Sequence, residues 1–237
     1  MKAILKKELN IYFKTPIAYV FIGMLISIGS IIFVAQNINN LSSDIPGFLA
    51  QLNTILIFLI PVLTMRMFCT EFSYGTNKLL FSNPISVIDI VLGKYISALI
   101  VFIVSAVLSL VFVFFTFIYG KIYFSEIALA YSGFILQAAA LIAVDMFASS
   151  FSKNQIVAVI MAFGINIFLW IIDILSKSSM GFITKILNFI SLYKRMEPFI
   201  IGQLSYASIA FFILFSICFI LATIYRLNRV LYGGFRR

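Results

Sequence analysis

Residues 71–86 read EFSYGTNKLLFSNPIS and lie between two long apolar runs of a 237-residue chain. The segment holds a glycine, a proline, one charge of each sign and six further polar side chains. The whole chain is 63% hydrophobic and only 11% charged, with a mean hydropathy of +1.14, whereas a soluble domain carries about 25% charged residues. Because this composition cannot cover a globule with polar groups, the sequence predicts an integral membrane protein in which residues 71–86 connect two spans.

The apolar runs define the expected fold. A helix that crosses about 30 Å of hydrocarbon needs roughly 20 apolar residues. Six runs reach or approach this length and predict an all-α integral membrane protein with one transmembrane domain over residues 1–237. The predicted spans are about 17–35, 52–68, 95–119, 127–149, 155–175 and 204–225. The second span is short and contains Pro61, which is tolerable if a neighbouring helix covers the carbonyl that the proline frees.

Two shorter segments flank these spans. In residues 1–14, apolar side chains recur at helical spacing opposite Lys7, Asn10 and Lys14, which predicts an N-terminal elbow helix in the membrane interface. Its apolar face consists of Ile4, Leu5, Leu9, Tyr12 and Phe13. A secretory leader is the alternative, but no small-residue cleavage site follows. Within residues 174–203, the stretch GFITKILNFISLY predicts a short outer amphipathic or re-entrant helix before the last span, or an ordinary interfacial loop helix.

The distribution of charge predicts the orientation. With the N-terminus in the cytoplasm and six alternating spans, most of the 17 lysine and arginine residues lie on the cytoplasmic side. Both termini are then cytoplasmic, in a multi-pass protein of the cell (plasma) membrane. The net charge of +9 is explained by loops that face anionic lipid, without a nucleic-acid partner. Residues 71–86 become the largest cytoplasmic loop.

Several kinds of chemistry are excluded by the residues themselves. The chain has no histidine, which excludes histidine metal sites and Ser-His hydrolysis. A phosphate-binding loop of the form G-x-x-x-x-G-K-[ST] is also missing, since neither Gly93-Lys94 nor Gly120-Lys121 has the required neighbours. We therefore expect no enzymatic activity, no metal and no cofactor on this chain, and any ATPase must be another polypeptide.

Two acidic residues are candidate functional groups. Asp145 lies near the inner end of the fourth span, where it could reach water or take part in an inner gate or substrate path. Asp173, at the outer end of the fifth span, is expected to be solvated. Glu71 begins the polar loop, in which Gly75 permits a turn and Asn83-Pro84 ends a short helix. The loop is either locally capped or presents this helix to another protein.

A resemblance adds to this interpretation. The block MRMFCTEFSYGTNKLLFSNPISVIDIVLGKY (65–95) resembles the signature of ABC-2-type exporter permeases, and AALIAVDMFASSFSKNQIVAVI (139–160) is similar to a second family block. The positions that match the first pattern are Met65, Arg66, Glu71, Gly75, Thr76, Leu79, Leu80, Pro84, Ser86, Gly93, Lys94 and Tyr95. The short permeases of gliding-motility and nitrous-oxide-operon type are the most similar subgroup. The chain departs from the pattern at Cys69, Thr70, Asn77 and Asp145.

The resemblance implies the transmembrane subunit of an ATP-binding cassette exporter for a hydrophobic or amphipathic substrate. Residues 71–86 would form a coupling helix lodged in a separate ATPase subunit, which binds the ATP and magnesium. The residues expected to couple to that ATPase are Arg66, Glu71, Gly75, Thr76, Leu79, Leu80 and Pro84. The other expected partners are a second permease chain, identical or paralogous, the lipid bilayer and, by analogy with the gliding subgroup, an accessory extracytoplasmic subunit. The alternative function is a stand-alone secondary transporter or channel that uses Asp145.

Overall fold

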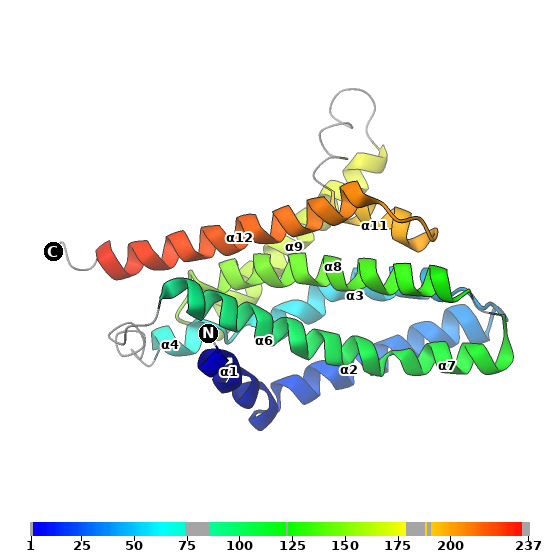
Figure 1. The fold of residues 1–237 in the computed structure, drawn as a ribbon, viewed down its shortest axis with the longest axis horizontal. Helices are drawn as coiled ribbons and strands as arrows, with labels where there is room; N and C mark the ends of the chain where they lie inside the picture. The colour runs from blue at the N-terminus through cyan, green and yellow to red at the C-terminus, as the bar shows by residue number, and fades with distance from the viewer. Residues whose placement is uncertain (1, 74–85, 122, 179–187, 189–190, 234–237) are drawn as a thin grey trace.

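The computed structural model of the chain describes residues 2–73, 86–121, 123–178, 188 and 191–233. The regular structure in these ranges is helical, with no strand among them, which confirms the predicted all-α class (Figure 1). The elements are α1 (Lys2–Lys14), α2 (Ile17–Phe33), η1 (Val34–Ile38), α3 (Ile45–Thr64), α4 (Cys69–Ser73), α6 (Val87–Leu108), α7 (Leu110–Tyr119), α8 (Phe124–Ser149), α9 (Gln155–Ser178), α11 (Leu192–Ile200) and α12 (Tyr206–Gly233).

Six helical stretches are long and apolar enough to cross a membrane, as the sequence predicts. They are Pro16–Ile38, Ile45–Ser73, Val87–Tyr119, Phe124–Ser149, Gln155–Ser176 and Tyr206–Arg229. The second stretch is not short, because its helix begins at Ile45 rather than at residue 52. The Asp44 side chain accepts a hydrogen bond from the Gly47 N–H at 2.9 Å and so caps this earlier start. Ser86 caps α6 in the same way, by accepting from the Asp89 N–H at 3.1 Å.

Helix α8 forms the centre of the bundle and packs against α3, α6, α9, α11 and α12 (Figure 1). In its most apolar stretch 67% of the residues are buried, against 22% in α9. Many of its buried residues are alanines, among them Ala138, Ala140 and Ala143. Small side chains let membrane helices approach closely. The core is therefore built around α8, while the less buried helices keep one side free for lipid or other chains.

The proline inside α3 is accommodated as predicted. Pro61 has no N–H, so the carbonyl of Ile57, one turn earlier, loses its donor within the helix. Asn166 on α9 donates its Nδ2 to this carbonyl at 3.3 Å. Asn166 is fully buried. A neighbouring helix thus covers the freed carbonyl. The missing backbone hydrogen bond of α3 is replaced by one from α9, which attaches the two helices to each other.

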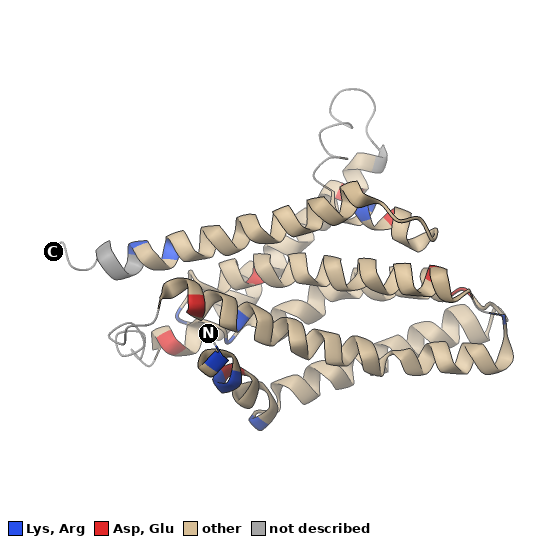
Figure 2. Cartoon of the chain, viewed as in Figure 1, with Lys and Arg blue, Asp and Glu red and all other residues tan. Residues whose placement is uncertain are grey.

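Helix α1 is present, and only part of its predicted apolar face is buried against the protein. Ile4, Glu8 and Tyr12 are buried, whereas Phe13 is exposed. The helix packs against α6 and α2, at the end of the bundle that also holds α4 and the C-terminal part of α12 (Figure 1). We call this the α1 end, and the opposite end, where α7 finishes, the α7 end. Charged residues gather at the α1 end and around α11, and few interrupt the long spans between them (Figure 2). The position of α1 in a membrane interface stays a prediction.

A short helix, α11, precedes the last span. Most of the segment predicted to form the outer helix, residues 182–193, lies outside the described residues, and α11 begins at its end. Leu192, Met196 and Phe199 on α11 are buried, and the helix packs against α8. The predicted solvation of Asp173 is wrong: this residue is only 4% exposed and accepts a hydrogen bond from Ser191 at 2.7 Å. The hydrogen bond from Ser191, the N-cap residue of α11, therefore attaches the start of α11 to α9.

Candidate functional site

At the α1 end, four charged side chains from three helices lie close together. Lys94 Nζ on α6 lies 2.8 Å from Glu71 Oε1 on α4 and 3.0 Å from Glu8 Oε1 on α1. Lys7 Nζ lies 4.0 Å from the same oxygen of each glutamate. We call Lys7, Glu8, Glu71 and Lys94 the charged cluster. It joins segments that are far apart in the sequence, since Glu8 and Lys94 are separated by 86 positions.

Three members of the charged cluster are largely removed from water, whereas Lys7 is half-exposed. The Lys94 side chain is 3% exposed, and those of Glu8 and Glu71 are 9% and 13% exposed. The ring of Phe68 adds a cation–π contact, with its centroid 5.5 Å from Lys94 Nζ. Two lysines and two glutamates balance formally in charge. Because buried charges are costly unless paired, each member holds the others in place, and this fixes how the three helices meet.

Neighbouring residues on α6 and α1 explain why the cluster forms here. At Gly93, an added Cβ would lie 2.8 Å from Ile4 Cγ2, so the glycine allows α1 to lie directly on α6. Tyr95 donates its hydroxyl to the Ala139 carbonyl of α8 at 3.2 Å. Tyr12 donates to the Leu63 carbonyl at 3.1 Å, and burial, with the Glu8 carboxylate, raises the pKa of this phenol. These contacts bind α1 and α6 to the core on both sides of the charged cluster.

We expect Gly93→Ala to lower the stability of the detergent-solubilised chain by about 1–3 kcal/mol, as overpacking does. The new methyl group would meet Ile4 and move α1 away from α6. Thermal unfolding and the rate of tryptic cleavage at Lys6 and Lys7 measure this effect. Gly164→Ala is the matched control, since nothing lies within 4 Å of its added Cβ. Equal melting temperatures and cleavage rates for the two variants would contradict the packing argument.

The structure brings together only part of the predicted coupling residues. Glu71 lies in the charged cluster, and Arg66 is half-buried in the turn between α3 and α4, without an ion pair to any described residue. The predicted positions outside the described residues are Gly75, Thr76, Leu79, Leu80 and Pro84. Sequence reasoning did not single out Glu8, and it named Lys94 only as a position that matches the family pattern. A signal existed for Glu8, which is spaced four residues from both Ile4 and Tyr12, the ends of the buried face.

Asp145 lies apart from the charged cluster, in the core of the bundle. The prediction that it could reach water is wrong, because the residue is 0% exposed. Its Oδ2 accepts a hydrogen bond from Asn166 Nδ2 at 3.2 Å, and the same Nδ2 also donates to the Ile57 carbonyl. Farther along α8, Gln137 accepts from Asn53 of α3 at 2.6 Å. These polar contacts attach α8 to α3 and α9; a role for Asp145 in a substrate path stays a prediction.

The comparison with known families decides what kind of protein carries this site. The sequence matches the family described as ABC-2 family transporter protein over residues 9–230, almost the whole chain. The chain belongs to the ABC-2 transporter family. ABC-2 permeases are membrane components without an ATPase site of their own, in agreement with the missing phosphate-binding loop. The matched region contains all six spans and two members of the charged cluster, Glu71 and Lys94. No curated protein shows significant similarity to the chain, and the predicted subgroup of ABC-2 permeases stays a prediction.

Proposed function

We propose that this ABC-2 permease couples to a separate ATP-binding cassette ATPase at its α1 end and exports a hydrophobic or amphipathic substrate. The observation that carries the proposal is the ion pair between Glu71 and Lys94. Glu71 lies on α4, which leads into residues 74–85, and Lys94 lies on α6, which follows them. The two helices that flank this segment are therefore held to each other and to α1.

The charged cluster suits the transmission of a movement. A buried ion pair with short hydrogen bonds resists separation, because separated charges would remain without partners in a medium of low dielectric constant. A displacement of residues 74–85 by an ATPase subunit would therefore move α4, α6 and α1 as one unit. Tyr12 and Tyr95 would carry this displacement to α3 and α8 through their hydrogen bonds. In this proposal the partner hydrolyses ATP with its magnesium ion, and this chain transmits the movement.

The orientation is part of the same proposal. The α1 end would face the cytoplasm, in agreement with the charged residues that gather there (Figure 2). A second permease chain, identical or paralogous, would pack beside this one, and the substrate would pass between the two. Apolar side chains on the outside of the bundle, such as Phe168 and Leu214, are more than 60% exposed and suit contact with lipid or with that second chain.

A photo-crosslinking amino acid at Leu79, within the proposed coupling segment, is expected to attach a P-loop ATPase in intact membranes. The same amino acid at Leu204 is the matched control, because Leu204 is exposed and directly precedes the last span, away from the charged cluster. Mass spectrometry identifies the attached proteins. ATPase attachment at residue 79 but not at 204 supports the proposal.

Attachment at neither position, from a chain that is folded in the membrane, would contradict coupling to an ATPase. A tagged chain purified in mild detergent then serves as the second measurement. A P-loop ATPase in roughly equal amount, with or without a second permease, supports the complex. A chain that is recovered alone and still transports would instead favour a stand-alone transporter, and the role of Asp145 would then be tested directly.

A further inference from the structure

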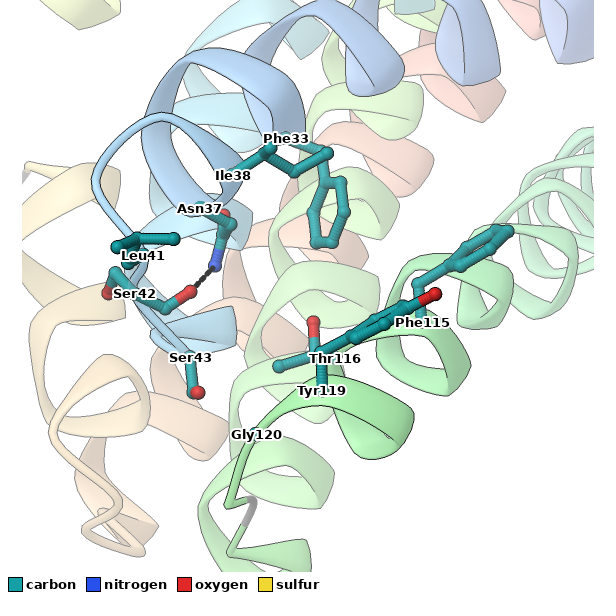
Figure 3. A pocket seen from close by; sticks show the side chains of 10 residues that line it. All are labelled: Phe33, Asn37, Ile38, Leu41, Ser42, Ser43, Phe115, Thr116, Tyr119 and Gly120. Carbon is teal, nitrogen blue, oxygen red and sulfur yellow. Dashed lines mark hydrogen bonds between the residues drawn. The ribbon is translucent and has the colours of Figure 1, made fainter.

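A pocket of about 510 Å³ opens at the α7 end, opposite the charged cluster (Figure 3). One wall comes from the last turn of α2 and from η1, with Phe33 and Ile38, and the facing wall comes from α7, with Phe115 and Tyr119. Ser42 and Ser43 complete it between these walls (Figure 3). None of the residues that line this pocket carries a charge. The pocket can therefore accept an apolar group without leaving an ionised side chain unpaired.

The backbone around the pocket departs from ordinary helix geometry. Val34–Ile38 forms a π-helical turn, in which the Asn39 N–H donates to the Val34 carbonyl at 2.9 Å. Such turns are rare and frequently mark functional sites. Leu41, on the pocket rim, has a φ of 52°, a left-handed conformation that is uncommon for a residue other than glycine. The wider turn and the left-handed residue both occur at the pocket, where they shape one of its walls.

Asn37 holds one wall of the pocket in place. The residue is 4% exposed and lines the pocket. Its Nδ2 donates to the carbonyls of Ser42 and Asp44 at 3.1 and 3.2 Å, which fixes the turn after η1. Its Oδ1 is covered by protein, so this side chain supports the wall and offers no acceptor to a ligand.

The surroundings favour a lipid over other ligands. The pocket lies where two apolar stretches end, Pro16–Ile38 and Val87–Tyr119, and therefore at the expected edge of the hydrocarbon layer. Leu41 and Tyr119 at its mouth are 95% and 85% exposed, and tyrosine is enriched at this depth of a membrane. Lys121, which directly follows the lining residue Gly120, is exposed and adds a positive charge beside the mouth.

We infer that this pocket binds one acyl chain of an anionic membrane phospholipid, with the headgroup at Ser43 and Lys121. The apolar walls would hold the chain, and Lys121 would attract the phosphate. The inference is independent of the proposed function, since a lipid can bind here whether or not the permease couples to an ATPase.

Fluorescence quenching tests the inference on the full-length chain in detergent. Trp170→Phe removes the single tryptophan, and Tyr119→Trp places a new one at the pocket. Phosphatidylglycerol with brominated acyl chains is then titrated at low lipid-to-detergent ratio. We expect quenching that saturates at about one lipid per chain. Phosphatidylcholine with the same acyl chains is expected to bind more weakly, and Lys121→Gln is expected to reduce this preference.

Two further variants test the pocket itself in the same background. Ser43→Phe fills it, and Leu41→Asn removes an apolar wall with a residue that tolerates the left-handed conformation. Each is expected to weaken the lipid affinity about tenfold, the effect of leaving roughly two methylene groups of the acyl chain uncovered. Ser125→Phe is the matched control, because Ser125 is exposed and does not line the pocket. Quenching that rises linearly with lipid and is unchanged by Ser43→Phe and Leu41→Asn would overturn the inference.

Discussion

Lys94→Met is expected to lower the free energy of unfolding by about 3–5 kcal/mol, because it removes the buried ammonium that pairs with two buried carboxylates. Lys94 Nζ lies within 3.0 Å of both the Glu8 and the Glu71 carboxylate, whereas Lys7 Nζ lies at 4.0 Å and its side chain is half-exposed. The variant should also detach α1, since Glu8 would be left facing Glu71. Titration with sodium dodecyl sulfate, followed by fluorescence, measures the change.

The neutral triple variant Lys94→Met, Glu8→Gln, Glu71→Gln separates charge from packing. Replacing all members of a buried ionic group by neutral residues of similar size is often close to neutral for stability. We therefore expect the triple variant to regain most of the stability lost in Lys94→Met. In a complex with an ATPase, it should still weaken the coupling of ATP hydrolysis to transport. Equal losses of stability in the single and triple variants would show that charge is not what holds the three helices together.

Asn166→Leu is expected to lower the free energy of unfolding by about 1–3 kcal/mol, the usual cost of leaving a buried polar group without a partner. The change removes the donor both to the Ile57 carbonyl, which Pro61 leaves free, and to Asp145 Oδ2. Asn10→Leu is the control, because Asn10 is exposed on α1 and such substitutions change stability by less than about 0.5 kcal/mol.

A second substitution identifies which of the two contacts matters. Pro61→Ala restores a backbone N–H that can donate to the Ile57 carbonyl within α3. In this background Asn166→Leu should cost less than in the natural chain, and the difference is the energy of the contact between Asn166 and Ile57. If the cost is the same in both backgrounds, the stabilisation by Asn166 comes from Asp145 alone.

Sequence reasoning succeeded in part at the Asn166 contact near Pro61 and at the charged cluster, and what it could not predict has a physical cause. The need for a donor near Pro61 follows from covalent chemistry, since a proline always frees one carbonyl, and that prediction is confirmed. The identity of the donor, Asn166, does not follow, because it lies on another helix, 109 positions from Ile57. Similarly, the location of Glu71 beside a polar loop was evident, whereas its pairing with Lys94, inside an apolar stretch, was not.

Helix α1 shows what periodicity leaves open. The apolar residues of 1–14 predict an interfacial helix with one apolar face, and in the structure Ile4 and Tyr12 are buried together with Glu8 while Phe13 is exposed. Periodicity tells which side of a helix avoids water, but it does not distinguish lipid from protein, because lipid tails are as apolar as leucine. Phe13 can therefore face lipid, while Glu8 turns toward the buried cation of Lys94.

By itself, the sequence determined that the chain is an all-helical membrane protein with six spans and without an ATPase site, because length and hydropathy decide what can cross a bilayer. Only the tertiary structure decided how α1, α4 and α6 meet at the charged cluster, and how α9 supports α3. These contacts join residues from separate helices, and helix packing sets their distances. Local sequence patterns encode the faces of each helix but not the partner that each face meets.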